Sequence, residues 1–272
     1  MLHLIDPWER KYIKNLKDKE LVTWDDFYAW QFLPKHSWVY DKYLLSKYTG
    51  VLTFDLETEI PHSSDFPLII KPRTNFEGLS KNAYIASSPD EIEHIQGMIA
   101  QKYLTGHQGT ADVVMKDGVM IDKFAFTTHK NHYDEIKLFS SNPFFPLKVR
   151  QKLEMILRDY TGVCNVEYIE DQIIEIHLRP SLQFYDICGG FIEALPAFYK
   201  TGKWKPIKYV KTFSRVYRTL QNGYPEVLQM PNKLPDNVTS IKLCWKDGKK
   251  VAETDASLGG NRYRGINGKN KR

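Results

Sequence analysis

Two neighbouring stretches carry the most informative pattern in this sequence: Val163-Cys-Asn-Val-Glu-Tyr-Ile169 and Ile173-Ile-Glu-Ile-His-Leu-Arg179. In both stretches apolar and polar residues alternate, which is typical of half-buried β-strands. The three polar residues between them, Glu170-Asp171-Gln172, favour a turn. We therefore predict an antiparallel hairpin over residues 163–179.

If residues 170–172 form the turn, the register of this hairpin follows, because the residue numbers of every two facing positions then have the same sum. The expected pairs are Ile169 with Ile173, Glu167 with Glu175, Asn165 with His177, and Val163 with Arg179. The intervening residues would form an apolar face toward the core: Cys164, Val166, Tyr168, Ile174, Ile176 and Leu178. The other face would gather two carboxylates, an amide, an imidazole and a guanidinium.

The facing pair Glu167 and Glu175 points to a bound cation. Like charges directly opposite each other destabilise a sheet, and a cation between them relieves the repulsion. Mg²⁺ prefers oxygen ligands and typically takes one or two carboxylates together with phosphate oxygens. The alternative is a solvent-exposed face with scattered charges.

A second feature lies where the apolar strand 66–71 ends at Lys71. A polar loop with one glycine, Gly78, follows it. A strand-end lysine beside a loop lined with backbone N–H groups has the chemistry of a phosphate cradle. The sequence contains neither GxxxxGK nor GxGxxG, so a P-loop is excluded and no dinucleotide-binding fold is indicated.

The rest of the chain reads as a mixture of helices and hairpins. Helices are expected over residues 23–32, 38–48, 89–99 and 146–160. The helix 89–99 would begin at the capping box Ser88-Pro-Asp-Glu91. A second hairpin, 110–116 with 119–126, would turn at Asp117-Gly118.

Composition excludes several classes of protein. Of 272 residues, 42% are hydrophobic and 26% charged, which is unlike a disordered, collagenous or disulfide-framework chain. No apolar run approaches the ~20 residues of a membrane span, and the first residues lack a signal-peptide pattern. Three widely spaced cysteines without CxxC indicate a reducing compartment. We expect a cytoplasmic protein with no membrane partner.

The net charge of +5 is unevenly distributed. Residues 200–272 hold 17 Lys and Arg against 5 Asp and Glu, a net charge of +12, so residues 1–199 carry −7. In the basic part, aromatic residues alternate with lysines and arginines, a pattern suited to a phosphate backbone with stacked bases. The alternative is a solvated surface followed by a disordered end.

The order of these parts resembles the ATP-grasp superfamily, and most closely its carboxylate–amine and carboxylate–thiol ligases. The resemblance covers about residues 40–182 and rests on six segments in order: 41–51, 66–73, 75–81, 101–108, 165–167 and 175–180. It implies an α+β ATP-grasp fold in which two α+β subdomains grip ATP, with a truncated N-terminal lead and a basic C-terminal extension. The implied division is a short helical segment (1–40), a lid subdomain (41–104), a metal and substrate subdomain (105–199), and a basic extension with a flexible tail (200–272).

The resemblance also assigns residues to the nucleotide. Lys42 and Lys71 would contact the ATP phosphates, and loop 75–81, with Gly78 and Lys81, would close over the triphosphate. The hinge would be Gln101, Lys102, Tyr103 and Leu104, whose backbone at Lys102 and Leu104 would read the adenine edge. Gln108 falls where the family usually has an acidic residue for the ribose hydroxyls.

Metal and catalytic positions are implied in the same way. Glu167, Glu175 and His177 fall on the family's magnesium ligands, with Mn²⁺ as an alternative metal, and Arg179 matches an arginine that steadies the transferring phosphate. The implied reaction activates a substrate carboxylate as an acylphosphate, which an amine or thiol then attacks, with Lys71 and Arg179 offsetting charge. Two alternatives are a small-molecule kinase and a nucleic-acid-binding protein with a vestigial ATP site.

Four departures from the family pattern concern these positions. Gln101 and Gln108 replace acidic residues, Asn165 stands where many of these ligases have an arginine, and His177 replaces an asparagine. They suggest an altered metal preference, a different reaction or lost catalysis. Only about 40 residues precede Asp41, where the family usually has a complete α/β domain. This suggests a minimal enzyme, an enzyme whose acceptor site is built by the basic C-terminal segment, or an enzyme that needs a partner. In the second case the acceptor would be an acidic molecule or a nucleic acid.

Overall fold

The computed structural model describes residues 13, 15–74, 76, 83–93, 95–130, 136–141, 144–181, 190–207, 212–218, 238–246 and 249–257. The chain forms two compact units. Unit 1 comprises residues 1–22, 124–144 and 181–272, and unit 2 comprises residues 23–123 and 145–180. These units divide the chain differently from the four segments expected from the sequence, and that division stays a prediction.

Unit 2 begins with three short helical elements. Helix α2 (Asp26–Phe32) is capped by the side chain of Asp25, and a 3-10 turn, η3 (Ser37–Tyr40), leads into helix α3 (Lys42–Thr49). The single helix expected over 38–48 is thus divided at Asp41. This residue is extended, and its side chain accepts hydrogen bonds from the first turn of α3. Gly50 ends α3 in the left-handed conformation at φ 76°.

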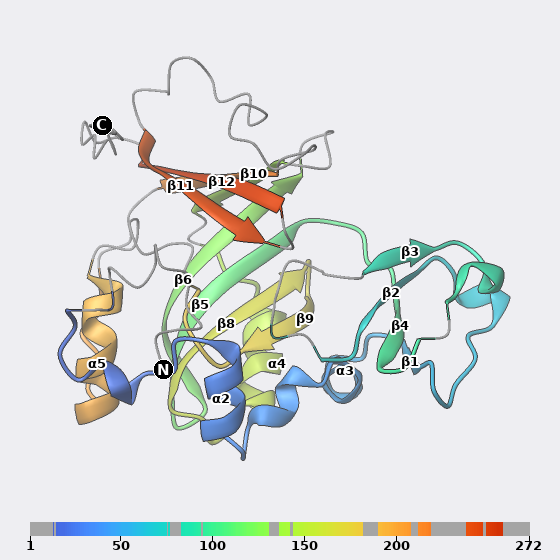
Figure 1. Cartoon of the computed structure of the whole chain (residues 1–272). Helices are drawn as coiled ribbons and strands as arrows, with labels where there is room; N and C mark the ends of the chain where they lie inside the picture. Colours follow the sequence, from blue (N-terminus) through green and yellow to red (C-terminus); the bar gives the residue numbers. More distant parts are fainter. Residues whose placement is uncertain are drawn as a thin grey trace. The chain divides into compact units, whose positions relative to one another are not determined.

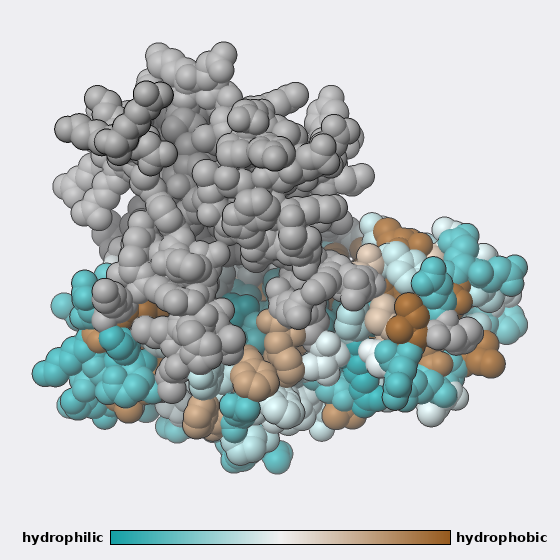
Figure 2. Space-filling model, viewed as in Figure 1, coloured by the Kyte–Doolittle hydropathy of each residue, from teal (hydrophilic) through white to brown (hydrophobic). Residues whose placement is uncertain are grey.

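A four-stranded antiparallel sheet follows in unit 2 (Figure 1). Its strand order is β1 (Thr53–Asp55), β4 (Met98–Lys102), β2 (Leu68–Pro72) and β3 (Tyr84–Ala86). A short 3-10 turn, η4 (Ser63–Asp65), precedes β2. One face of the sheet packs around a small apolar core of Leu56, Leu68, Ile70, Ala86, Met98 and Ala100. Isolated exposed apolar residues, drawn brown among teal ones in Figure 2, lie on the outside of this sheet and are ordinary for a protein surface.

The helix expected over residues 89–99 is wrong. Only a 3-10 turn, η5 (Pro89–Glu91), forms after Ser88, whose side chain makes no capping hydrogen bond. The end of this segment is instead the central strand β4, which pairs with β1 on one side and β2 on the other. Tertiary pairing therefore outweighs the local helix-start signal.

The second sheet of unit 2 contains the hairpin on which the sequence analysis centres. Strand β5 (Gln108–Lys116) pairs with β8 (Gly162–Ile169), which pairs with β9 (Gln172–His177). Helix α4 (Leu147–Ile156) contacts β9, and α3 contacts both β9 and α4 (Figure 1). The predicted turn at Asp117-Gly118 is present between β5 and the long strand β6 (Val119–Lys130), with φ values of 50° and 80°.

The register of β8 and β9 confirms the central part of the prediction and corrects its end. Glu167 pairs with Glu175 and Asn165 with His177. A bulge after Glu167 then pairs Tyr168 with Ile173 instead of Ile169 with Ile173. Ile174 is the extra residue of the bulge and has no register partner on β8. Ile173 therefore lies on the buried face, where the prediction had placed Ile174.

Unit 1 contains a separate set of elements. Strand β6 continues into this unit, where the neighbours in order are β6, β7 (Ile136–Ser141), β10 (Thr212–Arg218), β12 (Lys249–Ser257) and β11 (Val238–Lys246). Helix α5 (Phe191–Thr201) and the 3-10 turn η2 (Lys19–Leu21) also belong to this unit, and Lys200 pairs with Asp18 at 3.0 Å. The predicted flexible tail at the C-terminus lies outside the described residues. Within the described part of the chain, no helix is long and apolar enough to cross a membrane.

Candidate active site

Lys42 is positioned by the start of α3. Its backbone N–H donates to the carbonyl of Arg73 at the end of β2 (2.9 Å). The Arg73 guanidinium binds the carboxylates of Asp41 and Asp55, each at 2.7 Å. These contacts tie the first turn of α3 to the strand that carries Lys71, so the two lysines are held relative to one another.

Both lysine side chains are buried and approach the β8–β9 hairpin. The Lys42 ammonium lies 3.7 Å from the Glu175 carboxylate. Lys71 is only 7% exposed, and no hydrogen bond or ion pair joins its side-chain ammonium to another described residue. Burial lowers the pKa of Lys71 to about 8, although the nearby carboxylates of Glu175 and Glu167 act to raise it. The charges of Lys42 and Lys71 act on each other in this largely buried place, which favours an anionic ligand.

Glu167 and Glu175 lie side by side across the hairpin, as the register requires. Gln108 donates to Glu167 (3.4 Å). Burial would raise the pKa of Glu175, but Lys42 and the hydrogen bond from His177 outweigh it and hold this pKa well below its usual range. No cluster of three or more His, Cys, Asp or Glu ligands occurs among the described residues. The two carboxylates therefore fit a cation that completes its coordination with phosphate oxygens and water, as Mg²⁺ does.

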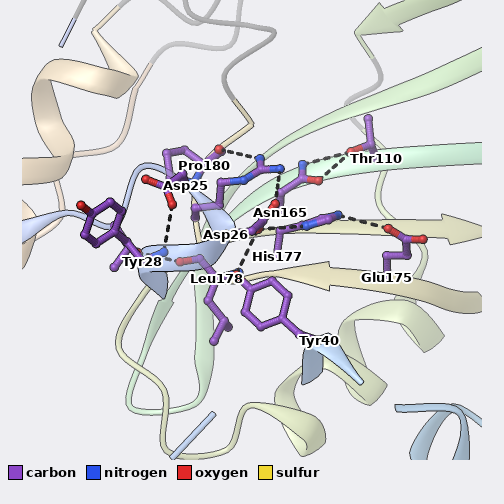
Figure 3. A network of polar contacts seen from close by, with 12 residues as sticks. Asp25, Asp26, Tyr28, Tyr40, Thr110, Asn165, Glu175, His177, Leu178 and Pro180 are labelled. Carbon is purple, nitrogen blue, oxygen red and sulfur yellow. Dashed lines mark hydrogen bonds and ion pairs between the residues drawn. The ribbon is translucent and has the colours of Figure 1, made fainter. Parts of the chain in front are cut away.

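His177 uses both ring nitrogens on carboxylates (Figure 3). Its Nδ1 lies 3.1 Å from Asp26, and its Nε2 lies 3.4 Å from Glu175. Burial alone would lower the pKa of His177, but the carboxylates raise it to about 9. A protonated imidazole has no free lone pair. In this arrangement His177 orients Glu175, and it would ligate a metal only after losing its proton.

A residue that the sequence analysis did not single out, Asp26, lies at the centre of this network (Figure 3). The residue is 5% exposed, and its carboxylate accepts from the Tyr40 hydroxyl at 3.0 Å. Tyr40 in turn accepts the backbone N–H of Leu178 at 2.9 Å. Burial would raise the pKa of Asp26, but Arg179 and His177 outweigh it and hold the pKa below its usual range. The first residue of α2 thus reaches the end of β9.

Arg179 follows β9 and is held at two nitrogens. Its Nη2 donates to Asp26 at 2.8 Å, and its Nη1 donates to the carbonyl of Pro180 at 3.1 Å. Because the guanidinium is planar, two fixed nitrogens define the plane of the group.

A polar group on β5 continues the same face of the sheet. Asn165 is buried, and its Nδ2 donates to Thr110 at 3.0 Å and to Asp112 at 2.9 Å. Since Thr110 is the register partner of Glu167, a row of polar residues runs across β5, β8 and β9. This row belongs to the candidate site, because it contains Glu167 and Glu175.

The predicted hinge lies at the end of β4. The side chain of Gln101 is buried and donates to Thr53 at 3.0 Å. The backbone N–H groups of Lys102 and Tyr103 donate to Leu52 (2.8 Å) and Pro67 (3.2 Å). In the described part of the chain the N–H of Leu104 has no such partner, so among these three it is the one suited to an adenine edge.

The predicted phosphate loop is represented by one described residue, Phe76. Its ring lies 5.4 Å from that of Tyr40, 6.2 Å from Phe27 and 5.8 Å from Trp30, measured between ring centroids. This aromatic contact places the described point of the loop against α2. Gly78 and Lys81 lie outside the described residues.

Sequence reasoning missed Asp26, Tyr40, Thr110 and Asp112. A usable signal existed for Asp112, because a carboxylate within the apolar run 110–116 is unusual in a buried strand. Asp26 carried no such signal, since aspartates at the start of a helix are common as caps.

Comparison with known proteins identifies the fold. No protein-family model and no curated protein matches the sequence. Among solved structures, the ADP complex of PurK, an N5-carboxyaminoimidazole ribonucleotide synthetase, is similar with a TM-score of 0.57 and 14% identity, over 87% of this chain and 74% of that chain. The carboxyaminoimidazole ribonucleotide synthase of Aspergillus clavatus in complex with ATP is similar with a TM-score of 0.54 and 16% identity, over 81% of this chain and 68% of that chain.

These similarities establish that the chain has the ATP-grasp fold, a mixed α+β architecture, as the resemblance in the sequence implied. At 14% and 16% identity they concern the fold alone.

Proposed function

We propose that this protein, which has the ATP-grasp fold, is an ATP- and Mg²⁺-dependent ligase. It activates a substrate carboxylate as an acylphosphate for attack by an amine or a thiol. One observation carries the proposal: two buried lysines, Lys42 and Lys71, approach the facing carboxylates of Glu167 and Glu175. The similar solved structures are of a synthase and a synthetase crystallised with ATP or ADP, which supports nucleotide binding.

The charge of each side chain indicates which part of the substrate complex it would bind. Lys42 and Lys71 would bind the ATP phosphates, because ammonium groups form charge-assisted hydrogen bonds with phosphate oxygens. Glu167 and Glu175 would hold Mg²⁺, which supplies positive charge to the phosphates when bound. Gln101, Lys102, Tyr103, Leu104 and Gln108 would border the nucleoside, with Gly78 and Lys81 covering the triphosphate.

The reaction needs positioning and charge stabilisation more than a protein nucleophile. A carboxylate oxygen of the substrate attacks the γ-phosphorus, and the bond between that phosphorus and ADP breaks. The Arg179 guanidinium would offset the charge on the transferring group. The amine nitrogen then attacks the acyl carbon, phosphate leaves, and the amine gives up its proton to solvent.

The acceptor and the compartment follow from charge and cysteine chemistry. A net charge of +12 over residues 200–272 favours a substrate that carries negative charge. Cys164, the cysteine whose side chain the structure describes, is free and buried. This supports a reducing compartment, the cytoplasm.

The test compares two glutamine variants of the same hairpin. Glu175→Gln should reduce ATP consumption at least about 100-fold, because it removes one of two proposed metal carboxylates. Glu170→Gln is the control, since Glu170 lies at the exposed turn and contacts His107; it should keep wild-type activity. If Glu175→Gln consumes ATP normally, the metal assignment is wrong.

The same assay separates the ligase from other activities. Release of ADP and phosphate only when both a carboxylate and an amine or thiol are supplied supports the ligase. A stable phosphorylated product would indicate a small-molecule kinase instead. Nucleic-acid binding that is sensitive to salt and occurs without nucleotide turnover would indicate a vestigial ATP site.

A further inference from the structure

Asp26 connects residues that are remote in the sequence and close to the proposed reaction. It lies 151 positions from His177 and 153 positions from Arg179, yet it contacts both. One carboxylate oxygen, Oδ1, lies 3.0 Å from the Tyr40 hydroxyl and 3.1 Å from His177 Nδ1. The other oxygen, Oδ2, lies 2.8 Å from Arg179 Nη2. Both carboxylate oxygens of Asp26 therefore contact polar groups at or near the end of β9.

We propose that Asp26 is a positioning residue that orients Arg179 toward the terminal phosphate of the nucleotide. The inference rests on the proposed function. Asp26 and the Pro180 carbonyl hold two guanidinium nitrogens, so they set the plane in which the group meets a phosphate.

Preorganisation explains why such a contact matters for phosphoryl transfer. An arginine side chain has many rotamers, and an anchored guanidinium avoids losing that freedom when the ligand binds. Because Asp26 is buried, its charge is poorly screened and its hold on Arg179 is strong. Tyr40 braces the carboxylate from the other side, since burial and the adjacent Asp26 raise the pKa of Tyr40 and keep its hydroxyl protonated.

The competing explanation is purely architectural. In that case the buried carboxylate would join α2 to β9 and affect only stability. The two roles differ in their effect on ligands, because Arg179 is proposed to meet the terminal phosphate, which ATP has and ADP lacks. A positioning role weakens the binding of a triphosphate selectively, whereas an architectural role affects both nucleotides alike.

The experiment measures the dissociation constants of MgADP and of a magnesium complex of a non-hydrolysable ATP analogue by calorimetry, on the full chain. Asp26→Asn should bind MgADP within about twofold of wild type and the analogue about tenfold more weakly, the effect of one charge-assisted contact. Asp25→Asn is the matched control. It neutralises the adjacent carboxylate but keeps an N-cap side chain that can accept from Tyr28, so it should bind both nucleotides as wild type does.

Equal affinities of Asp26→Asn and wild type for both nucleotides, or equal losses for both, would overturn the inference. If Asp26→Asn does not fold, Asp26→Glu retains the charge but displaces it by one methylene. This variant must then show the selective loss for the triphosphate, and unchanged binding of both nucleotides would overturn the inference. A wild-type chain that binds neither nucleotide would instead contradict the proposed function, and the inference would fall with it.

Discussion

Lys71 is the residue whose environment most clearly indicates a ligand. A lysine ammonium is strongly hydrated, and removing it from water is costly. The structure nevertheless keeps this ammonium buried beside Lys42 and two glutamates. An anionic ligand would offset the free-energy cost of removing this ammonium from water. The position of Lys71 is therefore what a binding site for an anion requires.

The lowered pKa of Lys71 predicts a pH dependence of nucleotide binding. Because this pKa is about 8 in the free protein, the ammonium loses its proton as the pH rises above 8. Phosphate oxygens bind the protonated form. The affinity for MgADP should therefore fall as the pH rises from 7 to 9.5, approaching tenfold per pH unit above about 8. Calorimetry at fixed ionic strength measures the dissociation constant of MgADP at each pH.

Lys71→Arg is the control for this prediction, because a guanidinium keeps its proton throughout this range. The variant should bind MgADP with an affinity that changes much less between pH 7 and 9.5. An equally steep fall in Lys71→Arg would show that another group is responsible.

At the scale of elements, the turn between β5 and β6 depends on a close backbone contact at Gly118. Gly118 has φ 80°, and its N–H donates to the carbonyl of Tyr160 at 3.0 Å. An added Cβ at this position would overlap the backbone carbonyl of Arg158. The turn is thus packed directly against the end of the α4 segment, and only glycine fits.

We predict that Gly118→Ala lowers the free energy of unfolding by about 2 kcal/mol or more, because steric overlap adds to the strain of a positive φ. Gly97→Ala is the control. Gly97 also has a positive φ, 76°, but an added Cβ would meet no atom within 4 Å. Its cost should be about 1 kcal/mol, from the backbone alone. Urea unfolding measures both, and equal losses would refute the steric argument.

At the scale of the whole molecule, charge is divided between the two ends of the chain. The proposed nucleotide site lies within residues 1–199, which carry −7, whereas residues 200–272 carry +12. Lys203 and Lys205 are exposed representatives of the basic part. This division suits a protein that meets an acidic acceptor through its C-terminal part.

We predict that the protein is retained on heparin at low salt, since clustered positive charge binds polyanions and salt screens the attraction. The double variant Lys203→Glu/Lys205→Glu should elute at lower salt. The control, Lys47→Glu/Lys116→Glu, changes the net charge equally in residues 1–199 at two exposed lysines. It should elute close to wild type, and an equal shift in both variants would mean that only the net charge matters.

The sequence by itself determined the features that depend on neighbouring residues. The alternation of residues 163–179 predicted two strands and the pairing of Glu167 with Glu175, because side chains alternate along a strand and a short turn sets the register. It did not reveal the bulge after Glu167, because a bulge depends on how both strands pack.

Only the tertiary structure decided the features that join distant parts of the chain. The capping box at Ser88 predicted a helix, but Met98–Lys102 became a central strand because β1 and β2 pair with it. Asp26 meets His177 and Arg179 across more than 150 residues. Such contacts leave no local pattern, since they join the first residue of α2 to the end of β9. For this reason the pairing of Glu167 with Glu175 was predictable, and the contacts of Asp26 with the groups near them were not.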